Sequence, residues 1–82
     1  MKIEVLGIGC AKCITLEKIV KEVVSHLDGN NEVVKVSEIL EIMKYNIVSM
    51  PGFAIDGKLL TSGKVLSRDA IARYIKEAKE NV

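Results

Sequence analysis

The sequence contains no Trp, a single Pro, one Phe and two Tyr, and its charges nearly cancel. Aromatic surface on which nucleic-acid bases could stack is therefore scarce. Twelve Lys and Arg against eleven Asp and Glu give a formal charge of +1, which provides no attraction to nucleic acid or to an anionic membrane. No apolar run approaches the ~20 residues of a membrane span. We therefore expect no nucleic-acid partner and no membrane association.

The chain is also short, and its 82 residues limit what it can enclose. A chain of this length buries about 60–65% of the surface that its unfolded form exposes, which supports one core and no large closed active site. We therefore expect a single domain over residues 1–82, a monomer that meets its substrates at the surface. Residues 1–5 alternate like a strand and show no leader peptide, which predicts a cytoplasmic location.

Hydrophobic periodicity predicts seven elements in the order βαβαββα. Two strands joined by a helical crossover, then a hairpin at Asp56-Gly57 and a closing helix, indicate an α/β fold. Its sheet is expected to be four-stranded and mixed, with helices on both faces. The strands are expected over 2–6, 32–36, 53–55 and 58–61, and the helices over 10–27, 38–44 and 68–79.

The ends of the helices carry capping and turn residues. Ser37 and Ser67 are predicted to cap the second and third helices, and Asn46 to close the second in the left-handed conformation. Residues 28–31 are predicted to form a turn after the first helix, and residues 80–82 are expected to fray. The second helix is expected to bury four apolar side chains, those of Ile39, Leu40, Ile42 and Met43.

The two cysteines, Cys10 and Cys13, stand where the first strand passes through a glycine loop into the first helix. Unpaired backbone N–H groups and the positive end of the helix dipole stabilise a thiolate there, and Lys12 adds a positive charge between the sulfurs. Residues three apart on a helix have Cα atoms roughly 5 Å apart, within the range for a disulfide. We interpret Cys10, at the open helix start, as the nucleophile, and Cys13, on the apolar stripe, as the resolving thiol.

Other interpretations of the cysteine pair stay open from the residues alone. A structural staple is disfavoured, because closing so small a loop contributes only ~2 kcal/mol on the chain-entropy model. Two inert core thiols fit poorly with a polar Lys12 and flanking glycines. Zinc needs four ligands and His26 is the only His, so no zinc site is expected. Copper(I) is the serious alternative, because two thiolates suffice to bind it, although copper chaperones usually carry Met where this chain has Ile8 and end in a strand.

Two segments, in the predicted order, resemble the thioredoxin and glutaredoxin superfamily, above all its small archaeal and bacterial members. The first is strand, loop and Cys10-Ala11-Lys12-Cys13, and the second is Ile47-Val48-Ser49-Met50-Pro51, where that superfamily carries a cis-proline. Over nearly the whole chain, the resemblance implies the thioredoxin fold, a cis Met50-Pro51 bond facing the disulfide, and substrate docking at Met50. From the residues alone, Pro51 is equally well the start of an edge strand.

The same resemblance implies roles for residues that also have ordinary interpretations. Glu4 lies six residues before Cys10, where thioredoxins carry a buried Asp that assists proton transfer at the second sulfur. It is otherwise a Glu near a sheet end. Gly63 would let a substrate backbone come close, or is simply a turn glycine. Lys12 and Glu4 are thus predicted to tune the ionisation of the thiols, while Lys12 is otherwise a solvated surface residue.

We therefore predict a thiol-disulfide oxidoreductase that reduces disulfide-bearing protein substrates in the cytoplasm, with copper(I) delivery as the alternative function. An apolar surface around Ile8, Ile47, Met50 and Pro51 is expected to dock the substrate. A reductase must restore the dithiol, whether a thioredoxin reductase, a ferredoxin-linked reductase or glutathione. No G-x-G-x-x-G loop is present, so no flavin or nicotinamide cofactor is expected. Ala11-Lys12 differs from the Gly-Pro of thioredoxins and the Pro-Tyr of glutaredoxins, so no subfamily is assigned.

Overall fold

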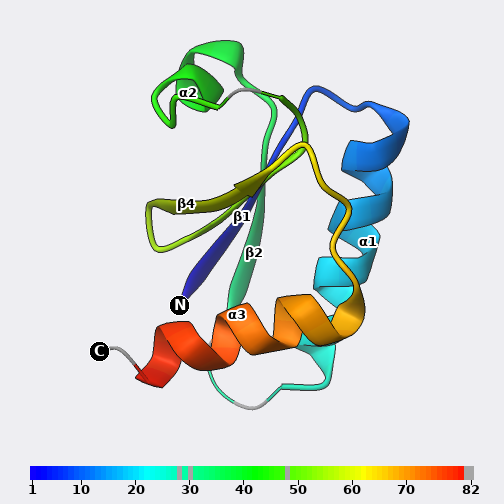
Figure 1. Cartoon of the computed structure of the whole chain (residues 1–82), viewed down its shortest axis with the longest axis vertical. Helices are drawn as coiled ribbons and strands as arrows, with labels where there is room; N and C mark the ends of the chain where they lie inside the picture. The colour runs from blue at the N-terminus through cyan, green and yellow to red at the C-terminus, as the bar shows by residue number, and fades with distance from the viewer. Residues whose placement is uncertain (28, 30, 48, 81–82) are drawn as a thin grey trace.

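The structure is a computed structural model that describes residues 1–27, 29, 31–47 and 49–80 (Figure 1). Three predicted features include residues outside these ranges. They are the turn at 28–31, the segment 47–51, which contains Val48, and the fraying end at 80–82. The predicted order of elements is confirmed. The elements are β1 (Lys2–Leu6), α1 (Ala11–Ser25), β2 (Glu32–Val36), α2 (Ile39–Met43), β3 (Gly52–Ile55), β4 (Lys58–Ser62) and α3 (Arg68–Glu80).

The strands form one mixed sheet in the order β2-β1-β3-β4. β1 runs parallel to β2, with Lys2 opposite Glu32, because α1 carries the chain back along the sheet between them. β3 pairs antiparallel with both β1 and β4. At the hairpin, Asp56 and Gly57 have φ of 49° and 85°, as the type I′ turn favoured by Asp-Gly requires. The α/β fold expected from the sequence is confirmed.

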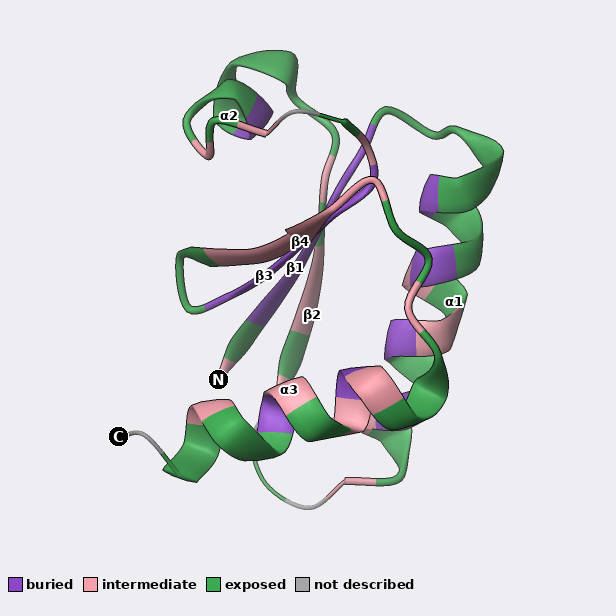
Figure 2. Cartoon of the chain, viewed as in Figure 1, coloured by how far each residue is buried: buried purple, intermediate pink, exposed green. Residues whose placement is uncertain are grey.

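The larger core lies between the sheet and the two helices α1 and α3, which cover the same face (Figure 1). Along β1 the side chains alternate, so Ile3 and Val5 enter this core while Leu6 faces the smaller cluster beneath α2. Buried positions follow β1, β3 and the sides of α1 and α3 turned towards the sheet (Figure 2). The ring of Phe53 packs against Tyr74 of α3, with centroids 6.0 Å apart.

Helix α2 differs from its prediction at both its cap and its buried side. The N-cap residue is Glu38, without a side-chain hydrogen bond, so Ser37 does not cap this helix. Ile42 alone is buried, whereas Ile39, Leu40 and Met43 are 57%, 77% and 63% exposed. The expectation of four buried side chains was wrong, because a helix of five residues turns only one of its sides to the sheet.

The other local signals agree with the structure. Ser67 caps α3, since its Oγ accepts a hydrogen bond of 3.2 Å from the Ala70 N–H. Asn46 has a φ of 53°, the left-handed conformation expected after α2. Within the described part of the chain, no helix is both long and apolar enough to pass through a bilayer.

Candidate active site at the start of helix α1

The two cysteines form a disulfide where β1 leads into α1. Cys10 is the N-cap residue, with an extended backbone (φ −68°, ψ 163°), and Cys13 lies in the first turn of the helix. Their Cα atoms are 5.0 Å apart, as the helical spacing predicted. The helix begins at Ala11, one residue later than expected, because Cys10 caps it from outside.

The two sulfurs differ in their access to solvent. Cys10 is exposed, whereas Cys13 is only 3% exposed, on the buried side of α1. The Cys13 N–H donates a hydrogen bond of 3.2 Å to Cys10 Sγ, so the outer sulfur occupies the position where a helix N-terminus stabilises negative charge. A thiolate at Cys10 would accept the same hydrogen bond. This arrangement favours attack on a partner by the outer sulfur and shelters the inner one.

The start of α1 carries no negative charge that would disfavour a thiolate at Cys10. The first turn of α1 has no acidic residue. The side chain of Lys12 is exposed and makes no hydrogen bond or ion pair with the residues that the structure describes. Its ammonium group is therefore not committed to another partner, and its effect on the thiolate stays a prediction. Ile8, two residues before Cys10, adds an apolar side chain that is 58% exposed.

The strand register brings the proline segment and Gly63 to the same end of the sheet as the cysteines. Leu6, at the end of β1, pairs with Gly52, so Pro51 lies beside the start of the cysteine loop. Gly52 also pairs with Ser62, which places Gly63 next to Pro51. The Gly63 N–H donates a hydrogen bond of 2.8 Å to the Pro51 carbonyl. Three segments far apart in the sequence thus meet at one end of the sheet.

Within this group, the Met50-Pro51 peptide bond is cis, in agreement with the resemblance. Pro51 is buried, whereas Met50 is half-buried and packs against the cluster beneath α2. Gly63 has a φ of 76°, and a Cβ at this position would collide with Ser49 Oγ. The chain itself therefore needs glycine here, which supports the interpretation of Gly63 as a turn residue. A close approach of substrate to Gly63 stays a prediction.

Glu4 is buried in the middle of β1, at 7% exposure, and its Oε1 accepts a hydrogen bond of 2.7 Å from the Tyr45 hydroxyl. Because side chains alternate along β1, Glu4 lies on the same face of the sheet as Leu6 and α2. Cys13 belongs to α1, which covers the other face of the sheet. The sheet therefore separates Glu4 from the sulfur that it was predicted to serve. Tyr45 was not identified from the sequence as the partner of Glu4. The one available signal was that a buried carboxylate needs a hydrogen-bond donor.

The same hydrogen bond makes Tyr45 titrate late. The bond to Glu4, followed by burial and the charges of Glu4 and Glu41, raises the pKa of Tyr45 to about 12 from an ordinary value of 10.0. The unfolded chain therefore loses this proton at lower pH than the folded chain. The contribution to stability is complete below pH 10 and is lost as the pH rises towards about 12.

We therefore expect the free energy of unfolding of the wild type to fall more steeply between pH 10 and 12 than that of Tyr45→Phe, as measured by chemical denaturation. Tyr74→Phe is the matched control, because it removes a phenol but keeps the ring against Phe53. It should retain the wild-type pH dependence. If Tyr45→Phe also retains it, the hydrogen bond to Glu4 does not govern this titration.

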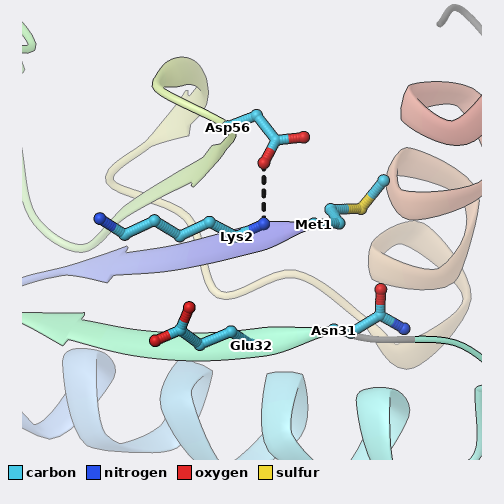
Figure 3. A pocket seen from close by; sticks show the side chains of 5 residues that line it. All are labelled: Met1, Lys2, Asn31, Glu32 and Asp56. Carbon is cyan, nitrogen blue, oxygen red and sulfur yellow. Dashed lines mark hydrogen bonds between the residues drawn. The ribbon is translucent and has the colours of Figure 1, made fainter.

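A separate depression lies at the opposite end of β1 (Figure 3). It has a cavity volume of about 520 Å³, and the Lys2 N–H donates a hydrogen bond of 2.7 Å to Asp56 Oδ1 beside it. Its lining residues are Met1, Lys2, Asn31, Glu32 and Asp56. It contains no cysteine, and among the described residues no group of His, Cys, Asp and Glu is arranged to hold a metal ion. The sulfur chemistry therefore belongs to the other end of the sheet.

Comparison with known proteins connects this arrangement to a family. Residues 1–76 match a family model described as a thioredoxin domain, a range that includes the cysteines, Pro51 and Gly63. A thioredoxin of Methanothermobacter thermautotrophicus is 37% identical over 75 residues, covering 92% of this chain and 97% of that protein. A thioredoxin of Methanocaldococcus jannaschii is 35% identical over 78 residues, covering 95% of this chain and 90% of that protein.

Proposed function

The chain belongs to the thioredoxin domain family and is a thiol-disulfide oxidoreductase, and on this premise we propose that its dithiol form reduces disulfides of partner proteins in the cytoplasm. Cys10 is the nucleophile and Cys13 the resolving thiol. The observation that carries this division is the difference in access, because Cys10 is exposed while Cys13 is 3% exposed. The family membership confirms the resemblance noted in the two sequence motifs.

The reaction proceeds in two exchanges between sulfur atoms. The Cys10 thiolate attacks one sulfur of the substrate disulfide, and the other substrate sulfur leaves as a thiolate that takes up a proton. Cys13 then loses its proton and attacks Cys10 Sγ in the mixed disulfide, which releases the second substrate thiolate to be protonated. Two electrons and two protons have passed to the substrate, and the protein is left with the Cys10–Cys13 disulfide seen in the structure.

The docking surface that we assign to the substrate lies at the meeting point of the cysteine loop, the proline segment and Gly63. Ile8 and Met50 supply apolar side chains that are exposed and half-buried, respectively. Pro51 is itself buried, so its part is to shape the segment, together with the hydrogen bond from Gly63. Such a shallow surface suits a protein segment that carries a disulfide better than an enclosed small molecule.

The resulting disulfide must be reduced again before the next cycle. A thioredoxin reductase, a ferredoxin-linked reductase or glutathione would supply the two electrons. Lys12, whose ammonium has no partner among the described residues, would add to the field that favours the Cys10 thiolate. Copper(I) delivery is the weaker candidate, since the elements follow the order βαβαββα and residues 1–76 match a thioredoxin domain.

A stoichiometric transfer experiment tests the proposal. Fully reduced protein is mixed with one equivalent of an oxidised protein that carries a single accessible disulfide, and both products are counted by thiol titration and intact mass. We expect one Cys10–Cys13 disulfide to form for each substrate disulfide lost. The double variant Cys10→Ser/Cys13→Ser is the control and should transfer nothing. Tight copper(I) binding by the wild type without any electron transfer would contradict the proposal in favour of copper delivery.

A further inference from the structure

Gly7 lies between the end of β1 and the cysteine loop, and its backbone conformation does not require a glycine. The residue is buried, and its N–H donates a hydrogen bond of 2.9 Å to the Val36 carbonyl, which extends the ladder between β1 and β2. It is not among the residues with positive φ, unlike Gly9 in the same loop, whose φ is 92°. A residue with a side chain could therefore adopt the backbone conformation of Gly7.

The space beside Gly7 is occupied by the inner cysteine. A Cβ built on Gly7 would overlap Cys13 Sγ and would lie 2.8 Å from Cys13 Cβ. Separations under 3.0 Å are essentially never found for real Cβ atoms, so one of the two residues would have to move. Gly7 is held to Val36 by its hydrogen bond, and Cys13 is held in the first turn of α1. The missing side chain therefore makes room for the buried sulfur.

We propose that Gly7 is a positioning residue that sets the balance between the disulfide and dithiol forms by leaving room for Cys13 Sγ in the disulfide. In the disulfide this sulfur is bonded to Cys10 and cannot turn away from Gly7. In the dithiol the bond is absent, so the Cys13 side chain can rotate to another staggered position. A methyl group at Gly7 meets Cys13 Cβ in both forms but meets a fixed sulfur only in the disulfide.

The proposal rests on the redox function assigned to the pair, and its measurement is an equilibrium rather than a turnover rate. One glutathione disulfide oxidises the protein dithiol to the disulfide and yields two glutathione thiols, so both electrons and protons balance. We expect Gly7→Ala to shift this equilibrium at least about tenfold towards the dithiol, which corresponds to a reduction potential about 30 mV higher. An equilibrium constant within twofold of the wild type would overturn the proposal.

Gly9→Ala is the matched control, because it adds the same methyl group to the same loop. A Cβ at Gly9 meets no atom within 4 Å, and because the strain from its positive φ involves neither sulfur we expect it to act equally on both redox forms. Its equilibrium constant with glutathione should stay within about threefold of the wild type. A shift as large as that of Gly7→Ala would show that any added methyl in the loop has this effect, and the proposal would fail.

A stability measurement keeps the test decisive if Gly7→Ala folds poorly. We expect Gly7→Ala to reduce the free energy of unfolding more in the disulfide-bonded protein than in Cys10→Ser/Cys13→Ser, where the sulfur and its bond are absent. Folding only in the second background would support the proposal. Equal losses, or failure to fold in both backgrounds, would overturn it. These outcomes are independent of substrate reduction, so the proposed function stands or falls separately by electron transfer.

Discussion

Replacing Cys10 with Ser is expected to lower the catalysed reduction of protein disulfides by at least about 1,000-fold, because the attacking nucleophile is removed. A serine hydroxyl at the N-cap still accepts the Cys13 N–H, so the start of α1 should be retained. The remaining thiol, that of Cys13, is 3% exposed and cannot reach a partner's disulfide. The loss would be measured as turnover with a chemical reductant that recharges the protein.

The control for this substitution is His26→Ala at the other end of the same helix. His26 is an exposed C-cap residue, so its loss should leave turnover close to that of the wild type. The free energy of unfolding of Cys10→Ser should be compared with that of the reduced wild type, which separates a lost nucleophile from a lost fold. Full activity in Cys10→Ser would show that the outer sulfur is not the nucleophile.

Replacing Cys13 with Ser should have an equally large effect on turnover but a different product. Cys10 can still attack, while the group that would resolve the mixed disulfide is gone. We therefore expect a covalent complex between Cys10 and the substrate to accumulate, at least about tenfold more than with Cys10→Ser, and a small thiol to release it. Intact mass under non-reducing conditions would identify the complex and its site.

This second experiment tests the order of attack, which turnover alone does not reveal. The two sulfurs lie close together, with Cα atoms 5.0 Å apart, and the roles are assigned from their access to solvent and from the hydrogen bond that Cys10 Sγ accepts. If Cys10→Ser trapped the substrate and Cys13→Ser did not, the roles assigned from exposure would be reversed. A complex in neither variant would point to a mechanism without a mixed disulfide.

Much of the fold could be predicted because its determinants are local. The turn at Asp56-Gly57, the left-handed Asn46 and the Ser67 cap each depend on residues within a few positions of one another. The apolar stripe of α1 likewise identified Cys13 as a buried residue. These signals were enough to locate the elements within one or two residues and to place the cysteine pair at the start of a helix.

The features that the sequence did not reveal depend on contacts between distant segments. The exposure of Ile39, Leu40 and Met43 depends on how the short helix α2 is placed over the sheet. The spacing of apolar residues within the helix does not determine that placement. The hydrogen bond from Tyr45 to Glu4 spans 41 residues. The fit of Cys13 Sγ against Gly7 appears only when β1 and α1 are packed together.

Strands β1 and β3 are the two interior strands, and both meet the reactive end of the molecule. β1 leads into the cysteine loop, and β3 begins directly after Pro51. An interior strand is hydrogen bonded on both edges, so its amide hydrogens exchange at free energies near that of global unfolding. We therefore expect the sulfurs and the proline to be attached to the strands whose amides exchange most slowly. The segments that carry the sulfurs and the proline should then lose their anchorage to β1 and β3 only when the cooperative fold itself is lost.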